Sequence, residues 1–345
     1  MSDSDIVKSI KLFDETASID PNDEHIFNGA TTGISNLNNT KYEWANPLYR
    51  TMVANHWIPE KVNMTEDRVT IKNLTEEEDM AVQDTLSFLI FLDSFQGNNL
   101  PNIRKYITSP VVSNLIAVQE FQEIIHQQSY QYMLDALYPY FKREEIYNRW
   151  RDNKILLKRN KFIAAIADDF INNPTIKNFK RIIIANYILE GVLFYSGFNL
   201  FDQLASRGKL VQASKMIDYI RTDEMTHMGI FINIIKEIFT WNNREDIEMA
   251  NAMFHDAAMQ EIEWCHSNYG NKILGISEAS SEQFVHWLVN DRMERIRLTP
   301  IFPKTENPYK HLNETGGADR RQNFFEAAAV TEYVTASSVG GWDNF

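Results

Sequence analysis

Cysteine is almost absent from this chain of 345 residues: Cys265 is its only one, so no disulfide can form within the chain. A lone thiol with no activating neighbour in the sequence is expected to be an inert, buried residue. A reducing compartment, the cytoplasm, is therefore the expected location. The first twenty residues are polar and acidic and lack the pattern of a signal peptide, so secretion by that route is not expected.

Basic residues are also scarce. The chain has 34 Lys and Arg against 47 Asp and Glu, which gives a net charge of −13. This balance disfavours nucleic acid and anionic membranes as partners and favours a cation as ligand. No uninterrupted apolar run is long enough for a membrane span, because the longest, 182–201, contains Asn186, Glu190 and Asn199. That run predicts a buried helix, and no glycine-rich phosphate loop is found.

Helical periodicity dominates what is present. The run Thr75–Glu78 predicts a capping box that begins an amphipathic helix. Helical patterns follow at about 75–96, 102–108, 110–137, 143–153, 157–172, 176–206, 210–241, 244–268 and 279–297. Only Arg68–Ile71 suggests an extended piece. We expect an all-α chain built around a four-helix core, with an N-terminal arm at 1–73, a helical domain at 74–299, and a C-terminal extension with a flexible tail at 300–345.

One helical pattern carries two polar residues that need compensation. Glu123, His126 and Tyr130 lie at i, i+3 and i+7 and share one face of the helix predicted at 110–137. An acid and a histidine on a stripe that enters an apolar core are costly unless something compensates them, and a bound metal ion is a common solution. This face therefore predicts half of a metal site.

The same unit occurs a second time. Glu224 and His227 form another Glu-x-x-His pair on the helix predicted at 210–241. Each pair is preceded by a lone acid in an apolar helix, Asp93 before the first pair and Glu190 before the second. Four carboxylates and two imidazoles suit a pair of iron or manganese ions, and this ligand set is described for ferritin-like di-metal bundles.

Two other acidic features are weaker candidates. A single Glu-x-x-His pair arises by chance in many helices, and we interpret Glu263 and His266, together with Glu261, as solvated. Asp84 lies about 180° around the helix from Asp93, so both cannot face one core. Asp93 is the better inward candidate. A metal-free bundle is disfavoured because six unpaired polar groups in one core would be costly.

The ligand runs also carry a family resemblance. In the type, order and spacing of its residues, the chain resembles the small, radical-generating subunit of class I ribonucleotide reductase, a ferritin-like di-metal protein. The matching positions are residues 92–96; Glu123, His126 and Tyr130; Glu190, Phe194 and Phe198; and Asp223, Glu224 and His227. The resemblance runs from about Trp57 to the C-terminus and includes 323–326. The end of the tail, 341–345, resembles a bacterial subclass that uses manganese or iron, which leaves the native metal open.

The resemblance implies roles for further residues. Tyr130 would carry a stable tyrosyl radical, and Phe194 and Phe198 would shield it. The radical would pass to the partner by a route formed by Trp57, Asp223, His126 and, in the tail, Tyr333. The docking residues would be Trp342, Asp343 and Phe345, with aromatic anchors entering a groove on the partner.

The resemblance also implies partners for the chain, and two alternative functions stay open beside it. The chain would homodimerise and act with a large catalytic subunit as a ribonucleoside-diphosphate reductase, and a flavodoxin-like activator stays open as a further partner. The rivals are a stand-alone di-metal oxidase and a ferritin-like iron-storage protein. Neither rival needs Tyr130 or the aromatic tail, so deleting Tyr333–Phe345 would leave the function of either intact.

Overall fold

A computed structural model describes residues 6–315, with the side chains of 313–315 excepted. Of the predicted C-terminal extension at 300–345, only 300–315 is described, so Tyr333, Trp342, Asp343 and Phe345 lie outside the described residues. The α-helices are α1 Ala45–Ala54, α2 Asp67–Thr70, α3 Glu76–Arg104, α4 Pro110–Leu137, α5 Tyr140–Asn148, α6 Lys154–Asn172, α7 Ile176–Ile188, α8 Tyr195–Ala205, α9 Val211–Ile238, α10 Arg244–Asn268, α11 Glu278–Arg295 and α12 Lys310–Thr315. Within 6–315 no β-strand occurs, and the all-α expectation is confirmed.

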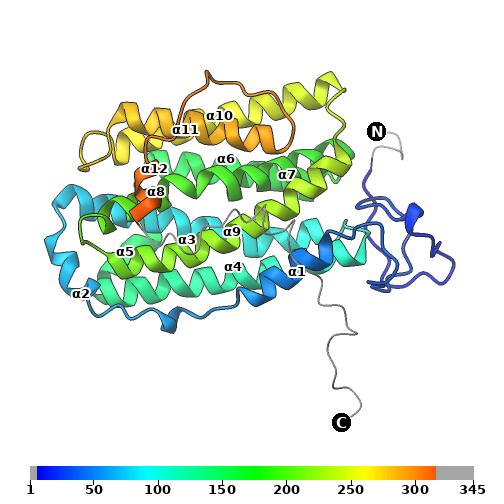
Figure 1. Ribbon diagram of the computed structural model, residues 1–345, viewed down its shortest axis with the longest axis horizontal. Helices are drawn as coiled ribbons and strands as arrows, with labels where there is room; N and C mark the ends of the chain where they lie inside the picture. The colour runs from blue at the N-terminus through cyan, green and yellow to red at the C-terminus, as the bar shows by residue number, and fades with distance from the viewer. Residues whose placement is uncertain (1–5, 316–345) are drawn as a thin grey trace, which may run out of the picture.

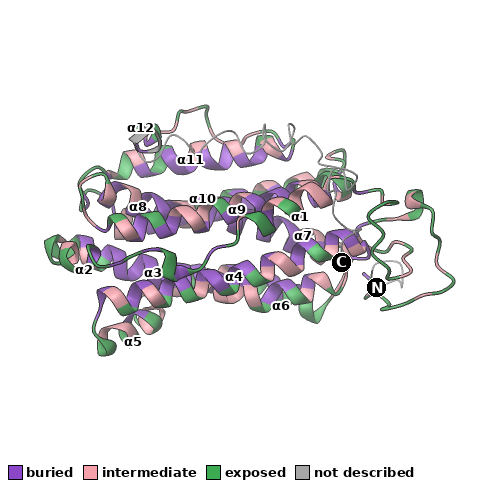
Figure 2. Ribbon diagram, turned by 60° about the horizontal axis from the view of Figure 1, so that its bottom comes forward, coloured by how far each residue is buried: buried purple, intermediate pink, exposed green. Residues whose placement is uncertain are grey.

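Four long helical units form the core (Figure 1). α3 packs against α4, α4 against α9, and α9 against α7 and α8, while α8 closes the ring onto α3. α7 and α8 are one unit joined by a five-residue π-helical turn, Leu189–Leu193, hereafter the π turn. Buried residues line the inward faces of these helices, and the unit formed by α7 and α8 is buried almost all round (Figure 2). This ring encloses the predicted ligand positions.

The remaining helices cover the ring from outside. α6 packs against α3 and α7, α10 packs against α6, α7 and α11, and α1 lies across α4 and α9. One stretch, Ile176–Ala205, is long and apolar enough to cross a membrane, but 94% of its most apolar window is buried inside the protein. It is a core helix, as expected. The three-part division at residues 73 and 299 stays a prediction.

Local sequence explains where the ligand helices begin. Thr75 and Glu78 form the predicted capping box of α3: Glu78 N donates to Thr75 Oγ1 at 3.2 Å, and Thr75 N donates to Glu78 Oε2 at 3.0 Å. Ser109 caps α4, and Pro110 occupies its first position, where a missing N–H costs nothing.

Four expectations about elements were wrong. The separate helix expected at 102–108 does not form, because 102–104 belong to α3 and 105–109 are not helical. α3 does not end near residue 96 but continues through Pro101 to Arg104, because Pro101 removes only one hydrogen bond near the helix end while Leu100 and Ile103 are fully buried. The helix expected at 176–206 is interrupted by the π turn. Arg68–Ile71 is not extended, since it forms α2 and the start of a 3₁₀ turn.

Candidate metal centre

The six predicted ligands come together at the centre of the ring. Asp93 comes from α3, Glu123 and His126 from α4, Glu190 from the π turn, and Glu224 and His227 from α9. All six side chains are fully buried. Their donor atoms form two groups: Asp93, Glu123, His126 and Glu224 within 4.8 Å of one another, and Glu123, Glu190, Glu224 and His227 within 4.8 Å of one another. Glu123 and Glu224 belong to both groups, so each can bridge two ions.

The distances around His126 fit a coordination sphere better than hydrogen bonding. Its Nδ1 lies 3.2 Å from Asp93 Oδ1, 3.3 Å from Glu123 Oε2 and 3.2 Å from Glu224 Oε1. One ring nitrogen cannot donate well to three carboxylates. Ligand atoms about 2.1 Å from one ion and at right angles lie about 3 Å apart. The set therefore fits a hard divalent cation among these four side chains.

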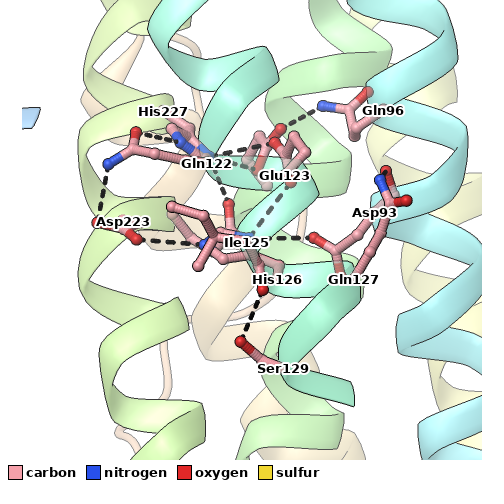
Figure 3. A network of polar contacts seen from close by, with 12 residues as sticks. Asp93, Gln96, Gln122, Glu123, Ile125, His126, Gln127, Ser129, Asp223 and His227 are labelled. Atoms are coloured by element: carbon pink, nitrogen blue, oxygen red, sulfur yellow. Dashed lines mark hydrogen bonds and ion pairs between the residues drawn. The ribbon is translucent and has the colours of Figure 1, made fainter. Parts of the chain in front are cut away.

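The second ring nitrogen of each histidine has its own partner (Figure 3). His126 Nε2 donates to Asp223 Oδ2 at 3.2 Å, and His227 Nε2 donates to Gln122 Oε1 at 3.0 Å. For His126 the assignment follows because a carboxylate accepts hydrogen bonds and does not donate them, and for His227 it follows because Gln122 Nε2 donates to Asp223, which leaves the amide oxygen to accept from the histidine. With a proton on Nε2, the Nδ1 atom of each histidine would be free to bind a metal ion held among the carboxylates, as in metal-bound histidines.

Charge and hydrogen bonding also fit a pair of cations. Four carboxyl oxygens, one from each acidic ligand, are buried and have no hydrogen-bond partner in the part of the chain from 6 to 315: Asp93 Oδ2, Glu123 Oε2, Glu190 Oε2 and Glu224 Oε1. Burial and the neighbouring carboxylates raise the pKa of Glu123 and Glu224 well above the usual range. Four ionised carboxylates would balance two divalent ions, so paired metal binding would relieve this repulsion.

Three glutamines that sequence reasoning missed surround the ligands. Gln119 Nε2 donates to Glu190 Oε1 at 2.8 Å, Gln96 donates to the same oxygen, and Gln122 joins His227 to Asp223. Each lies three or four residues from a ligand on its own helix, Gln96 after Asp93, Gln119 before Glu123 and Gln122 before His126. Inward glutamines at that spacing are the signal that could have identified them.

Asp223 connects His126 to Trp57, which lies in the predicted N-terminal arm. Its Oδ2 accepts from Trp57 Nε1 at 2.8 Å and from His126 Nε2 at 3.2 Å, and its Oδ1 accepts from Gln122 Nε2 at 3.1 Å. Trp57 is itself buried and stacks on Tyr219, with ring centroids 5.1 Å apart. The structure therefore brings together Trp57, Asp223 and His126 as a continuous hydrogen-bonded chain.

Tyr130 is fully buried one helical turn beyond His126. Its hydroxyl has no hydrogen-bond partner within residues 6–315, and burial together with the negative charge of Asp93 raises its pKa well above 10. Phe194 and Phe198 are buried on the segment that carries Glu190 and stack on each other with centroids 5.6 Å apart. Tyr130 is thus a neutral phenol shut away from solvent.

The rejected candidates lie elsewhere. Asp84 is buried on the other side of α3 and pairs with Arg149. Glu263 is exposed, as expected, but the expectation that Glu261 is solvated was wrong: it is fully buried and pairs with Arg159 at 2.6 Å. Cys265 is buried, as predicted, and burial raises the pKa of its thiol.

A ring of helices with a buried Asp, three Glu and two His defines a ferritin-like di-metal carboxylate protein. Comparison with known sequences identifies the family within this class of protein. The family "Ribonucleotide reductase, small chain" matches residues 34–308. The ribonucleoside-diphosphate reductase subunit beta of Treponema pallidum is 37% identical over 350 residues, 98% of this chain and 99% of that protein. The protein of the same name from Halalkalibacterium halodurans is 34% identical over 338 residues, 96% of this chain and 97% of that protein. This chain belongs to the ribonucleotide reductase small-chain family.

Solved structures agree with that membership. The ribonucleotide reductase R2 subunit from Clostridium botulinum aligns with a TM-score of 0.86 at 41% identity, covering 90% of this chain and 98% of that one. The dimanganese(II)-NrdF of Streptococcus sanguinis aligns with a TM-score of 0.69 at 20% identity, covering 79% of this chain and 95% of that one. At that identity the second likeness shows the fold alone.

Proposed function

We propose that this chain is the radical-generating small subunit of a class I ribonucleoside-diphosphate reductase, which acts with a large subunit to convert ribonucleotides to deoxyribonucleotides. The observation that carries the proposal is a ligand set with two shared carboxylates, Glu123 and Glu224, and a buried phenol, Tyr130, that feels the negative charge of Asp93 and Glu224. A stand-alone di-metal oxidase or an iron store would use the same ligands but has no need of that phenol.

The proposed ligands are those that converge in the ring. Asp93 and His126 would bind one ion, Glu190 and His227 the other, and Glu123 and Glu224 would lie between them. When bound, a pair of iron or manganese ions supplies a one-electron oxidant after reaction with an oxygen species. The protein holds the donors in place and excludes bulk water, since all six side chains are fully buried.

Tyr130 is the proposed radical site. It would give up one electron to that oxidant and lose its hydroxyl proton, for which the Asp93 carboxylate is a neighbouring acceptor. A neutral product suits this environment, because burial disfavours a charged phenolate. We propose that Phe194 and Phe198, both buried, shield the radical from water and from reductants.

The oxidation would leave the subunit through hydrogen-bonded side chains. The proposed route runs from His126 through Asp223 to Trp57, over the contacts of 3.2 Å and 2.8 Å described above. Tyr333 would relay it to the large subunit. The tail would dock on that partner through Trp342, Asp343 and Phe345. Two copies of the chain would form a homodimer. A flavodoxin-like activator and a cytoplasmic location are also part of the proposal.

One spectroscopic comparison tests the proposal. The protein is loaded with iron, or with manganese and a suitable activator, exposed to oxygen, and examined by electron paramagnetic resonance. A tyrosyl signal is expected in the wild type and in Tyr269→Phe, a control that removes another buried phenol whose hydroxyl meets Thr85 Oγ1 at 2.7 Å. The signal should vanish in Tyr130→Phe. Absence of any tyrosyl signal with either metal would refute the radical role.

A further inference from the structure

Arg292 lies on α11, outside the ring of ligand helices, yet it contacts the segment that carries Glu190 at three points. Its Nε donates to the Gly191 carbonyl oxygen at 2.9 Å, its guanidinium carbon lies 4.8 Å from the centre of the Tyr195 ring, and its backbone carbonyl accepts from the Tyr187 hydroxyl at 2.8 Å. These contacts lie before, within and after the π turn. Arg292 is itself only 5% exposed.

The π turn decides where Glu190 points. A π turn holds one residue more than the corresponding α turn, and each residue of an α-helix advances about 100° around the axis. Relaxation of Leu189–Leu193 to an α turn would therefore rotate α7 relative to α8 by about that angle. Glu190 Oε2 lies 3.5 Å from His227 Nδ1. After such a rotation, Glu190 and the inward residues of α8 could no longer both face the centre of the ring.

Gly191 marks the point of closest approach around this turn. A Cβ atom at this position would lie 3.0 Å from Met228 Sδ, 3.1 Å from Arg292 Cδ and 3.2 Å from Arg292 Nε. Met228 directly follows the ligand His227 on α9. The π turn, the end of α11 and the second ligand pair thus meet at one glycine, and the absent side chain lets Arg292 reach the backbone.

We propose that Arg292 is a positioning residue of the metal centre: by binding the Gly191 carbonyl it holds the π turn, which keeps Glu190 directed at His227. The inference rests on the proposed function, because Glu190 is one of the ligands assigned there. Helix α11 supplies no ligand, but through Arg292 it would control the geometry of the ligand Glu190.

Two substitutions that match each other in length separate this role from simple packing. Arg292→Gln keeps an N–H donor at the position of Nε, whereas Arg292→Met places a methyl group there, and both remove the charge. In the metal-free protein, hydrogen exchange of the amides at 189–195 is expected to quicken about tenfold in Arg292→Met, which loses the hydrogen bond, and to stay near the wild type in Arg292→Gln. Arg295→Met, which removes the other arginine bonded to Asp291, is the control and should leave this exchange unchanged.

Loaded protein gives a second measurement. Arg292→Met is expected to change the electron paramagnetic resonance spectrum of the metal pair and to weaken metal binding in chelator competition, while Arg292→Gln retains both properties. If Arg292→Met does not fold, Gly191→Ala, which crowds Met228 and Arg292, takes its place in both measurements. Equal behaviour of the Met and Gln variants, or wild-type exchange in both Arg292→Met and Gly191→Ala, would overturn the inference. A wild-type chain that binds no metal pair would refute the proposed function, and exchange in the metal-free protein would still decide the role of Arg292.

Discussion

Replacement of Asp223 by asparagine tests whether the side chain between the ligand histidine and Trp57 holds the metal centre in place. The carboxylate is 1% exposed and accepts three hydrogen bonds, from Trp57, His126 and Gln122. Asparagine offers one acceptor oxygen in place of two, and its NH₂ group adds donors to a site already filled with donors.

The magnitude follows from this count of donors. Because Oδ2 takes two of the three hydrogen bonds, the asparagine oxygen would serve Trp57 and His126, and its nitrogen would face the Gln122 amide. Turning Gln122 over would set its NH₂ against His227 Nε2–H, so one buried donor is unpaired in either orientation. Such a group costs about 1–3 kcal/mol. The asparagine oxygen still accepts from His126, but a neutral amide is a weaker partner than a carboxylate, and mutation of such an outer partner of a metal-bound histidine lowers metal affinity by about 10- to 100-fold.

Two assays measure these effects. Chelator competition gives the metal affinity, and urea denaturation of the metal-free protein gives the free energy of unfolding. Asp84→Asn is the matched control, because Asp84 is also buried on a ligand helix but pairs with Arg149. It should destabilise the protein without changing metal affinity. The reasoning fails if Asp223→Asn binds metal as tightly as the wild type, or if Asp84→Asn weakens binding equally.

Other contacts carry further predictions. Glu261→Gln is expected to lower the free energy of unfolding, measured in urea, by about 3–5 kcal/mol, because it leaves the buried Arg159 charge uncompensated. The double variant Arg159→Met/Glu261→Leu should lower the free energy of unfolding by less, because it removes both charges. Cys265, whose pKa burial raises, should react with iodoacetamide only after unfolding, and rapid labelling of the folded protein would contradict its burial. Deletion of 333–345 should abolish nucleotide reduction with the large subunit and leave metal content and the radical signal unchanged; retained reduction would exclude a role for the tail.

Much of the site could be predicted because helical spacing is local. The distances in sequence from Glu123 to His126 and from Glu224 to His227 place each pair on one helix face, wherever the helices pack. The cost of burying such groups without compensation then indicates a metal site. The same argument identified Asp93 and Glu190 as inward acids on their own helices. The structure brings all four carboxylates and both histidines together.

Other features could not be predicted because they depend on contacts between distant segments. Glu261 was expected in solvent, but it is buried and paired with Arg159 on α6, 102 residues away. α3 continues through Pro101 because packing of its last turn outweighs one missing hydrogen bond. The glutamines around the ligands have no meaning in sequence until the helices that carry them are assembled.

The sequence by itself determined the all-α class, the six side chains proposed as ligands and the position of Tyr130, since each follows from the 3.6-residue period and from the chemistry of the side chains. Only the tertiary structure decided which carboxylates can be shared, because that depends on how α4 and α9 face each other across the ring. It also decided the π turn at Glu190, whose geometry depends on an arginine from a helix that carries no ligand.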